Sequence, residues 1–213
     1  MRILLISEAN DAGSMVPLPL GLACVAASER AGHQVRLLAL GSDAICEIDV
    51  RHAIEQLSPH VIGISVRNID DQNMQSPRFL LASLRQVAAV CRAASSAPIV
   101  LGGAGYSIFP ESAMVYLGGD VGIRGEGEAA FPALLSWLEH DRQSSPPPAA
   151  YFPNGSHSPT AFAPSLDGFA LPEPGLWLDF PGSTEMRIPV QTRRGCPLDC
   201  IYCSEPPIIE GRP

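Results

Sequence analysis

The sequence predicts an α/β domain with a doubly wound parallel sheet of five strands, followed by a linker and the first part of a second domain. Five short apolar runs alternate with longer stretches of helical periodicity in the first two thirds of the chain. The runs are rich in β-branched residues and do not alternate with polar ones, which is typical of parallel strands buried on both faces. A segment rich in Pro, Ser and Gly then precedes a short end that contains three of the six cysteines.

The strand candidates are residues 3–6, 35–40, 61–65, 99–101 and 121–123. Because a stretch of helical periodicity lies between each pair, the strands are expected to run parallel and to be joined by right-handed crossovers. The repeated alternation of strand and helix predicts one domain over residues 1–141.

Helical periodicity predicts helices over residues 17–31, 47–57 and 76–94, a short one from about residue 110, and a last one that includes Phe131, Leu134, Leu135 and Leu138. Gly32 follows the first helix and Pro59 the second, and both residue types commonly end helices. Pro132 is expected in the first turn of the last helix or just after it, where a missing N–H costs little.

Composition narrows the class of protein. The chain has 213 residues, of which 46% are hydrophobic, so it can bury a substantial core. Its net charge of −8 argues against a nucleic-acid partner or an anionic membrane surface. No apolar run is long enough to span a bilayer, and the apolar residues at the start favour a buried strand over a signal peptide. These features predict a cytoplasmic protein.

The segment from 142 to 186 contains Pro146, Pro147 and Pro148 and is predicted to be an extended linker that buries no core. Residues 187–192 are predicted to form a strand that leads directly into the cysteine loop. Since one strand and one loop do not complete a domain, residues 187–213 are expected to be only the beginning of the second one.

The cysteine loop carries Cys196, Cys200 and Cys203 in a C-x3-C-x2-C spacing. Three thiolates can hold three corners of a cubane iron–sulfur cluster, which leaves the fourth iron open to a chelating ligand. A zinc site would need a fourth ligand nearby, and the nearest histidine in the sequence is the distant His157. A disulfide framework does not suit a cytoplasmic chain with scattered cysteines.

Small and polar residues follow the third, fourth and fifth predicted strands. Ligands of open α/β sheets bind at the carboxyl ends of the strands, so these positions are candidate binding residues. Tight turns between strand and helix are the plainer explanation for each glycine alone, and no Gly-x-Gly-x-x-Gly follows the first strand. The candidates are Ser65, Arg67, Gly102, Gly103, Gly105, Tyr106, Gly125 and Glu126.

The cysteine spacing, with the aromatic Tyr202 directly before Cys203, resembles the signature of radical S-adenosylmethionine (radical SAM) enzymes. The first domain is similar to the cobalamin-binding domain of B12-dependent radical SAM proteins, which has a flavodoxin-like fold. Five segments carry this likeness in order: Pro19-Leu20-Gly21-Leu22, Gly32-His33, Gly63-Ile64-Ser65-Val66-Arg67-Asn68-Ile69-Asp70, Leu101-Gly102-Gly103-Ala104-Gly105-Tyr106-Ser107 and Gly125-Glu126-Gly127-Glu128.

The resemblance implies three cofactors. Cys196, Cys200 and Cys203 would hold a [4Fe–4S] cluster, and S-adenosylmethionine would bind the open iron with its adenine near the backbone of Tyr202. Cobalamin would lie on the carboxyl edge of the sheet, lined by the eight candidates named above. The second domain would be the start of an incomplete radical SAM barrel.

The first loop departs from the cobalamin proteins that ligate cobalt through histidine, because it has Asn10, Asp11 and Gly13 but no histidine. His33 and His60 precede strands and are expected at the opposite edge of the sheet. We therefore expect no histidine on cobalt, and Arg67 is expected to approach the lower face of the corrinoid and disfavour a sixth ligand.

The implied activity is transfer of a methyl group from cobalamin to an unactivated carbon, in a small molecule or peptide of unknown identity, with an electron donor for the cluster. Cyclisation and rearrangement remain alternatives, and catalysis requires the rest of the barrel. Another reading is a non-catalytic corrinoid-binding module. A receiver-like or flavodoxin-like domain would share the fold but leaves the cysteine loop unexplained.

Overall fold

The computed structural model describes most of the first domain and part of the linker. The described residues are 1–8, 19–29, 32–40, 47–71, 73–140, 144–160, 162–163, 165–172, 189–191, 194 and 201. No helix within these ranges is long and apolar enough to cross a membrane.

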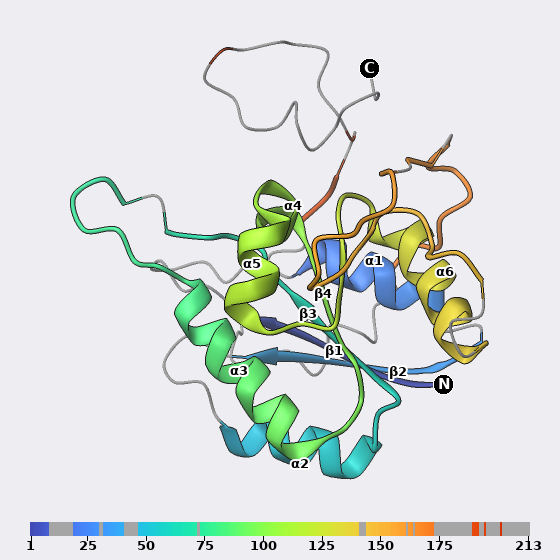
Figure 1. Cartoon of the computed structure of the whole chain (residues 1–213), viewed down its shortest axis with the longest axis horizontal. Coiled ribbons are helices and arrows are strands. Elements are labelled where there is room, and N and C mark those ends of the chain that lie inside the picture. The colour runs from blue at the N-terminus through green and yellow to red at the C-terminus, as the bar shows by residue number, and fades with distance from the viewer. Residues whose placement is uncertain are drawn as a thin grey trace.

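A six-stranded sheet of order β2-β1-β3-β4-β5-β6 forms the centre of the molecule (Figure 1). The first five strands are parallel and the sixth runs antiparallel to β5. Their bounds are β1 Arg2–Glu8, β2 Gln34–Leu40, β3 Val61–Ser65, β4 Ile99–Gly102, β5 Val121–Ile123 and β6 Ala150–Tyr151.

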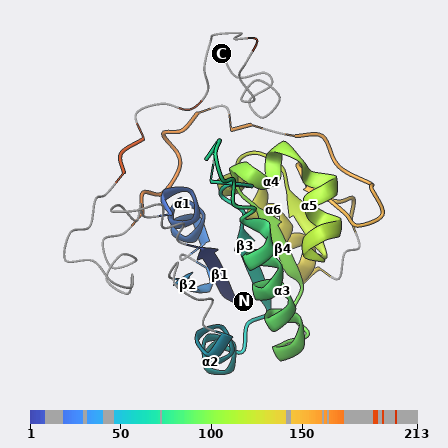
Figure 2. The same ribbon diagram turned by 90° about the vertical axis from the view of Figure 1, so that its left-hand side faces the viewer.

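Helices cover both faces of the sheet. The helices α1 and α6 contact each other on one face, and α2, α3 and α5 pack in sequence on the other (Figures 1 and 2). The bounds are α1 Leu20–Glu29, α2 Glu47–Leu57, α3 Leu81–Ala94, α4 Ala104–Ile108, α5 Pro110–Leu117 and α6 Gly127–Glu139.

Successive side chains of β1 enter two different cores. Ile3 and Leu5 pack with Phe131 and other residues of the α1/α6 face, whereas Leu4 and Ile6 belong to the cluster under α2, α3 and α5. All four are essentially inaccessible to solvent. The apolar first strand is therefore explained by burial on both faces, as the sequence predicted.

The structure confirms the α/β class and differs from the sequence prediction in three places. The helix expected from residue 76 begins at Leu81, because Arg78 donates a backbone hydrogen bond to Asp71 and Leu80 one to Ile69, which folds the preceding residues into a loop. The short helix α4 was not expected. The sixth strand lies in the segment predicted to be linker, where Ala149, Ala150 and Tyr151 are buried.

Pro132 lies in the second turn of α6, just after the first turn, as expected. Its missing N–H leaves the carbonyl four residues earlier without its usual helical donor. That carbonyl belongs to Glu128, in the first turn of the helix.

A buried acid marks the amino edge of the sheet. The side chain of Glu29 is 3% exposed, and its Oε2 lies 3.6 Å from His33 Nε2. The amino group of Met1 donates to His33 Nδ1 at 2.9 Å and lies 3.8 Å from a carboxylate oxygen of Glu139. Because Nδ1 accepts this bond, the neutral imidazole carries its proton on Nε2, which faces Glu29.

Burial raises the pKa of Glu29 to about 7, a hydrogen bond from Ser28 opposes the rise, and the charge of Glu139 adds to it. Since 4.5 is the ordinary value, the folded chain binds more protons than the unfolded chain between these two pH values. The contribution of Glu29 to stability therefore falls as pH rises from 4.5 to 7 and is constant above, by up to about 3 kcal/mol for a shift of this size.

We expect Glu29→Gln to remove most of this fall, because an amide does not ionise. The free energy of unfolding, measured in urea at pH 5, 6, 7 and 8, should decline less in the variant than in the wild type. Glu55→Gln is the matched control, since Glu55 is an exposed residue of α2. Parallel pH profiles for wild type and Glu29→Gln would contradict the assignment.

Candidate functional site

The strand order changes direction between β1 and β3 at the carboxyl edge of the sheet. The chain leaves β1 for α1 on one face, whereas it leaves the adjacent strand β3 for α3 on the other. Ligands of open α/β sheets bind where neighbouring strands diverge in this way. Ser7 and Ser65 are register partners at this point, and Glu8 is the last residue of β1.

Small residues end β3 and its neighbour β4 at the same edge. Ser65 of β3 is paired in register with Gly102 of β4, and both are partly exposed. Among the described residues, a Cβ built on Gly102 would meet only the carbonyl oxygen of Ile123, at 3.9 Å. Packing within this part of the chain therefore does not require glycine at position 102.

Gly103 and Gly105 are glycines for a different reason. Gly103 has φ of +100°, and a Cβ there would lie 2.5 Å from the carbonyl oxygen of Val66. The N–H of Gly105 donates to the carbonyls of Val66 and Arg67 at 3.0 and 3.1 Å. These glycines let the start of α4 pack directly on the backbone that follows β3.

Tyr106 lies beneath the edge. Its side chain is fully buried and occupies the space that a side chain at Gly122 would need. Burial, and then the proximity of Tyr151, raise the pKa of Tyr106. Its hydroxyl has no hydrogen-bond partner among the described residues. In this structure Tyr106 supports the strand ends from below, with its ring away from the surface.

Ser107, which sequence reasoning did not select, joins the two glycine-rich loops. Its hydroxyl donates to the carbonyl of Gly103 at 2.9 Å and accepts from the N–H of Gly125 at 3.0 Å. The residue is 1% exposed. A serine four residues after Gly103 in a short helix is placed to bond back to that carbonyl, which is the local signal that could have identified it.

Glu8 and Ser83, which are far apart in the sequence, form a hydrogen bond at the carboxyl edge. The Ser83 hydroxyl, in the first turn of α3, donates to Glu8 Oε1 at 2.6 Å. Burial raises the pKa of Glu8, and the bond from Ser83 opposes the rise. Nothing in the sequence pairs these residues, which are 75 positions apart.

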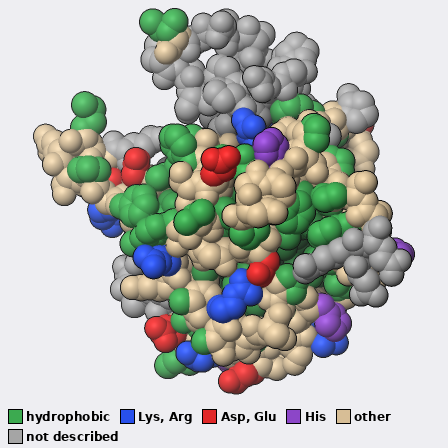
Figure 3. Space-filling view, viewed as in Figure 1, with side chains coloured by type: hydrophobic (Ala, Val, Ile, Leu, Met, Phe, Trp, Pro, Cys, Tyr) green, Lys and Arg blue, Asp and Glu red, His purple; other side chains and the backbone are tan. Residues whose placement is uncertain are grey.

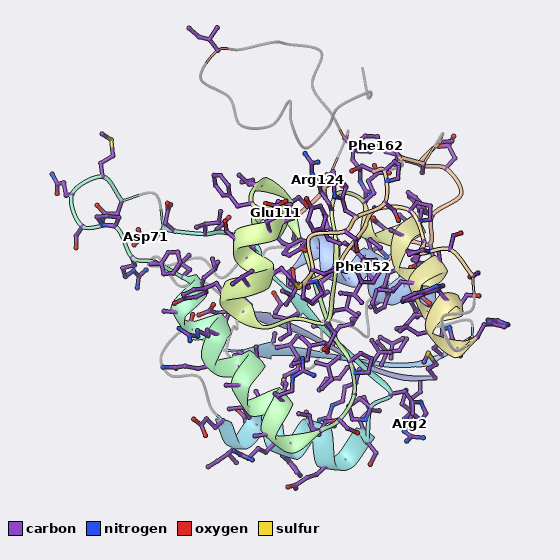
Figure 4. The ribbon with its side chains drawn as sticks, viewed as in Figure 1. Arg2, Asp71, Glu111, Arg124, Phe152 and Phe162 are labelled. Carbon is purple, nitrogen blue, oxygen red and sulfur yellow. The ribbon has the colours of Figure 1, made fainter. Side chains whose placement is uncertain are left out.

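Two acidic residues open α6 and hold later parts of the chain. Glu126 accepts a hydrogen bond from the N–H of Ala163 at 2.9 Å, and Glu128 accepts one from the guanidinium of Arg194. The two carboxylates are 10% and 5% exposed. Phe162 lies near Gly125, so this loop is the place where the linker crosses the edge (Figure 4).

The partly exposed Arg67 starts a loop that projects from the body of the molecule (Figure 1). Hydrogen bonds from the Arg78 backbone and side chain lower the pKa of Asp71 in this loop to about 2. The ring of Phe79 packs edge-on against Tyr116 of α5, with centroids 5.4 Å apart. Hydrophobic side chains gather on this side of the molecule (Figure 3), where Phe79 is 52% exposed.

The predicted cluster ligands Cys196, Cys200 and Cys203, together with Tyr202, lie outside the described residues. The residues that are described contain no group of three or more His, Cys, Asp or Glu side chains suited to a metal ion. His33 and His60 bond to Met1 and Arg2 at the start of β1, so both lie at the amino edge, as predicted.

A family model described as "B12 binding domain" matches residues 14–135, which is more than half of the chain. The chain belongs to the B12-binding domain family. The match begins before α1 and ends in α6, so it takes in β2 to β5 and the carboxyl edge described above.

Two curated relatives match nearly the whole chain. An uncharacterised methyltransferase of Pyrococcus horikoshii is 26% identical over 96% of the chain, and the hopanoid C-3 methylase of Methylococcus capsulatus is 29% identical over 87%. The chain spans only 45% and 35% of the lengths of these proteins. They therefore contain extensive sequence beyond the part that matches the B12-binding domain and its linker.

Solved structures share the fold of the B12-binding domain. The radical S-adenosylmethionine methyltransferase TsrM of Kitasatospora setae, with cobalamin and a [4Fe-4S] cluster bound, has a TM-score of 0.66 and 23% identity. The match covers 82% of this chain and 32% of TsrM. The cobalamin-dependent radical enzyme OxsB has a TM-score of 0.58 and 14% identity, over 76% of this chain and 23% of OxsB.

We expect Gly103→Ala to destabilise the B12-binding domain by about 2–4 kcal/mol, because a strained backbone and a clash with Val66 combine. Gly118→Ala is the control: Gly118 has φ of +71°, but a Cβ there meets nothing within 4 Å. Its cost should be only about 1 kcal/mol. Urea unfolding measures both, and equal losses would show that the contact with Val66 is unimportant.

Proposed function

We propose that this chain is the cobalamin- and cluster-binding part of a B12-dependent radical SAM methyltransferase that acts on an unactivated carbon. One observation carries the proposal: a B12-binding domain at residues 14–135 is followed in the same chain by the C-x3-C-x2-C spacing of Cys196, Cys200 and Cys203. The similarity to a hopanoid methylase and to TsrM supports methyl transfer as the reaction.

The carboxyl edge fits a large ligand such as cobalamin. Ser65 of β3 and Gly102 of β4 are partly exposed at this edge, and among the described residues a Cβ on Gly102 would meet only the carbonyl oxygen of Ile123. We propose that Ser65, Gly102 and Gly103 contact the ligand, with Arg67 and Gly125 at the two sides. Gly105, Tyr106 and Glu126 would act by shaping this edge, because Gly105 and Tyr106 are buried and the Glu126 carboxylate already holds Ala163.

Cys196, Cys200 and Cys203 would hold a [4Fe–4S] cluster, whose open iron binds S-adenosylmethionine near the backbone of Tyr202. The bound cofactors supply a carbon-centred radical and a methyl carrier. The residues of this chain bind and orient them, and an external electron donor is required. The substrate, a small molecule or peptide, would be chosen by parts of the protein outside the B12-binding domain.

A non-catalytic corrinoid-binding module is the second candidate. The observation in its favour is that the family match, at residues 14–135, covers the corrinoid-binding part alone and does not reach the cysteines. The two candidates differ in the cluster, which only the enzyme requires.

We expect Gly102→Leu to weaken hydroxocobalamin binding at least about tenfold while the protein stays folded, because the new side chain extends over the carboxyl edge. Gly32→Leu is the control, since Gly32 is exposed, meets nothing within 4 Å and lies at the other edge. Spectral titration measures both. Unaltered affinity in Gly102→Leu would count against this edge as the corrinoid site.

We expect Cys200→Ala to lose the iron and sulfide that the wild type takes up on anaerobic reconstitution, because two thiolates do not retain the cluster. Cys91→Ala is the matched control, because Cys91 is a buried residue of α3 and should not affect iron content. Equal iron in the two variants would refute the cluster assignment and favour the non-catalytic module.

A further inference from the structure

Arg194 precedes Cys196 by two positions in the sequence, and it is anchored on α6. Its Nη2 donates to Glu128 Oε1, and its Nη1 lies 3.8 Å from Glu126 Oε1. The guanidinium also lies over the ring of Phe169, with its carbon 5.7 Å from the ring centre. The side chain is only 18% exposed, so Arg194 is embedded between the linker and the B12-binding domain.

The position of the two acids makes this contact strong. Glu126 is the residue before α6 and Glu128 lies in its first turn, where the helix dipole favours negative charge. Glu128 is 5% exposed, and a carboxylate this deeply buried needs a charged partner. Arg194 supplies that partner from 66 positions away.

The direction of the pKa shift of Arg194 agrees with this geometry. Burial alone would lower the pKa of the guanidinium, but the hydrogen bond and charge of Glu128, with the charge of Glu126, outweigh it and raise the pKa. The charge of Glu128 raises the pKa of Cys24 in α1, and the charge of Arg194 lowers it. The contact therefore brings α1, α6 and the segment before the cysteines together at one place.

The loop between β5 and α6, which contains Gly125 and Glu126, also contacts the linker at a second point. Glu126 accepts from the N–H of Ala163 through Oε2, while Oε1 faces Arg194. A Cβ on Gly125 would lie 3.1 Å from the methyl group of Thr160, so the linker packs closely on the loop after β5. Ser107 fixes that loop through the N–H of Gly125. The linker and Arg194 thus share one support, at the edge proposed to bind cobalamin.

We propose that Arg194 is a positioning residue that docks the segment bearing Cys196, Cys200 and Cys203 on the carboxylates of Glu126 and Glu128. The docking itself needs no cofactor. Its significance rests on the proposed function: a fixed anchor two residues before the first cysteine would set the cluster at a defined distance from a corrinoid on the neighbouring strand ends.

The docking is tested on the cofactor-free chain by hydrogen exchange of the backbone amides in residues 189–204. We expect Arg194→Gln to accelerate exchange in this segment at least about tenfold, because a buried charge pair is broken. Arg194→Lys should restore part of the protection. Arg92→Gln is the control, since Arg92 forms an exposed ion pair with Asp120 on another side of the domain and should change nothing here.

Glu128→Gln provides an independent route if Arg194→Gln perturbs the fold. It should accelerate exchange in the same segment, and the double variant should add less than the two single effects combined, because both remove one interaction. Unchanged exchange in both single variants, or fully additive effects, would overturn the docking.

The positioning role has a separate spectroscopic test on chain loaded with cob(II)alamin and a reduced cluster. In the wild type the cluster should broaden the cob(II)alamin electron paramagnetic resonance signal, and Arg194→Gln should reduce this broadening at equal loading of both cofactors. Equal broadening would overturn the positioning role. A wild type that binds neither cofactor would refute the proposed function, while the exchange result would still decide the docking.

Discussion

The structure depends on one constraint: a parallel sheet must be buried on both faces. In β1 this requirement fills every central position with an apolar side chain, alternating between the two cores. Helices then occupy both faces, and only the two edges where strands begin or end remain for polar chemistry. All five parallel strands end at the carboxyl edge, which explains why the glycines after β4 and β5 and the acids of α6 gather there.

At that edge, glycine has two distinct uses. Gly103 and Gly105 bring one backbone against another, so their role is internal to the fold. Gly102 has space around its missing side chain among the described residues. A ligand that approaches the strand ends needs a glycine such as Gly102. The backbone at Gly102 is in turn held in place by the close packing at Gly103 and Gly105. The proposed binding surface and its support are therefore adjacent residues of one sequence segment.

The pattern of apolar residues along the sequence predicted those helices and strands whose bounds depend on neighbouring residues. The bounds of β3, β5 and α2 follow directly from their apolar runs and were predicted to the residue. The start of α3 was not, because the residues before it are held by Asp71 through contacts that propensity does not describe. β6 could not be predicted since a two-residue strand exists only through its partner β5. In the site, the edge residues followed from strand order, whereas the pairing of Glu128 with Arg194 joins distant segments and has no periodic signal.

Two buried acids, Glu29 and Glu128, are accommodated in different ways. Glu29 interacts with nearby residues, whereas Glu128 is paired with a residue far along the sequence. Glu29 at the amino edge lies beside His33, and burial raises its pKa to about 7, so the carboxyl group carries a proton for part of the time near neutral pH. A proton comes from solvent and places no demand on the rest of the chain. Glu128 at the carboxyl edge is matched by a guanidinium that must be delivered by residue 194. Because Glu128 is paired with Arg194, the electrostatics of this helix terminus restrict where residue 194 can lie, two positions before Cys196 in the sequence.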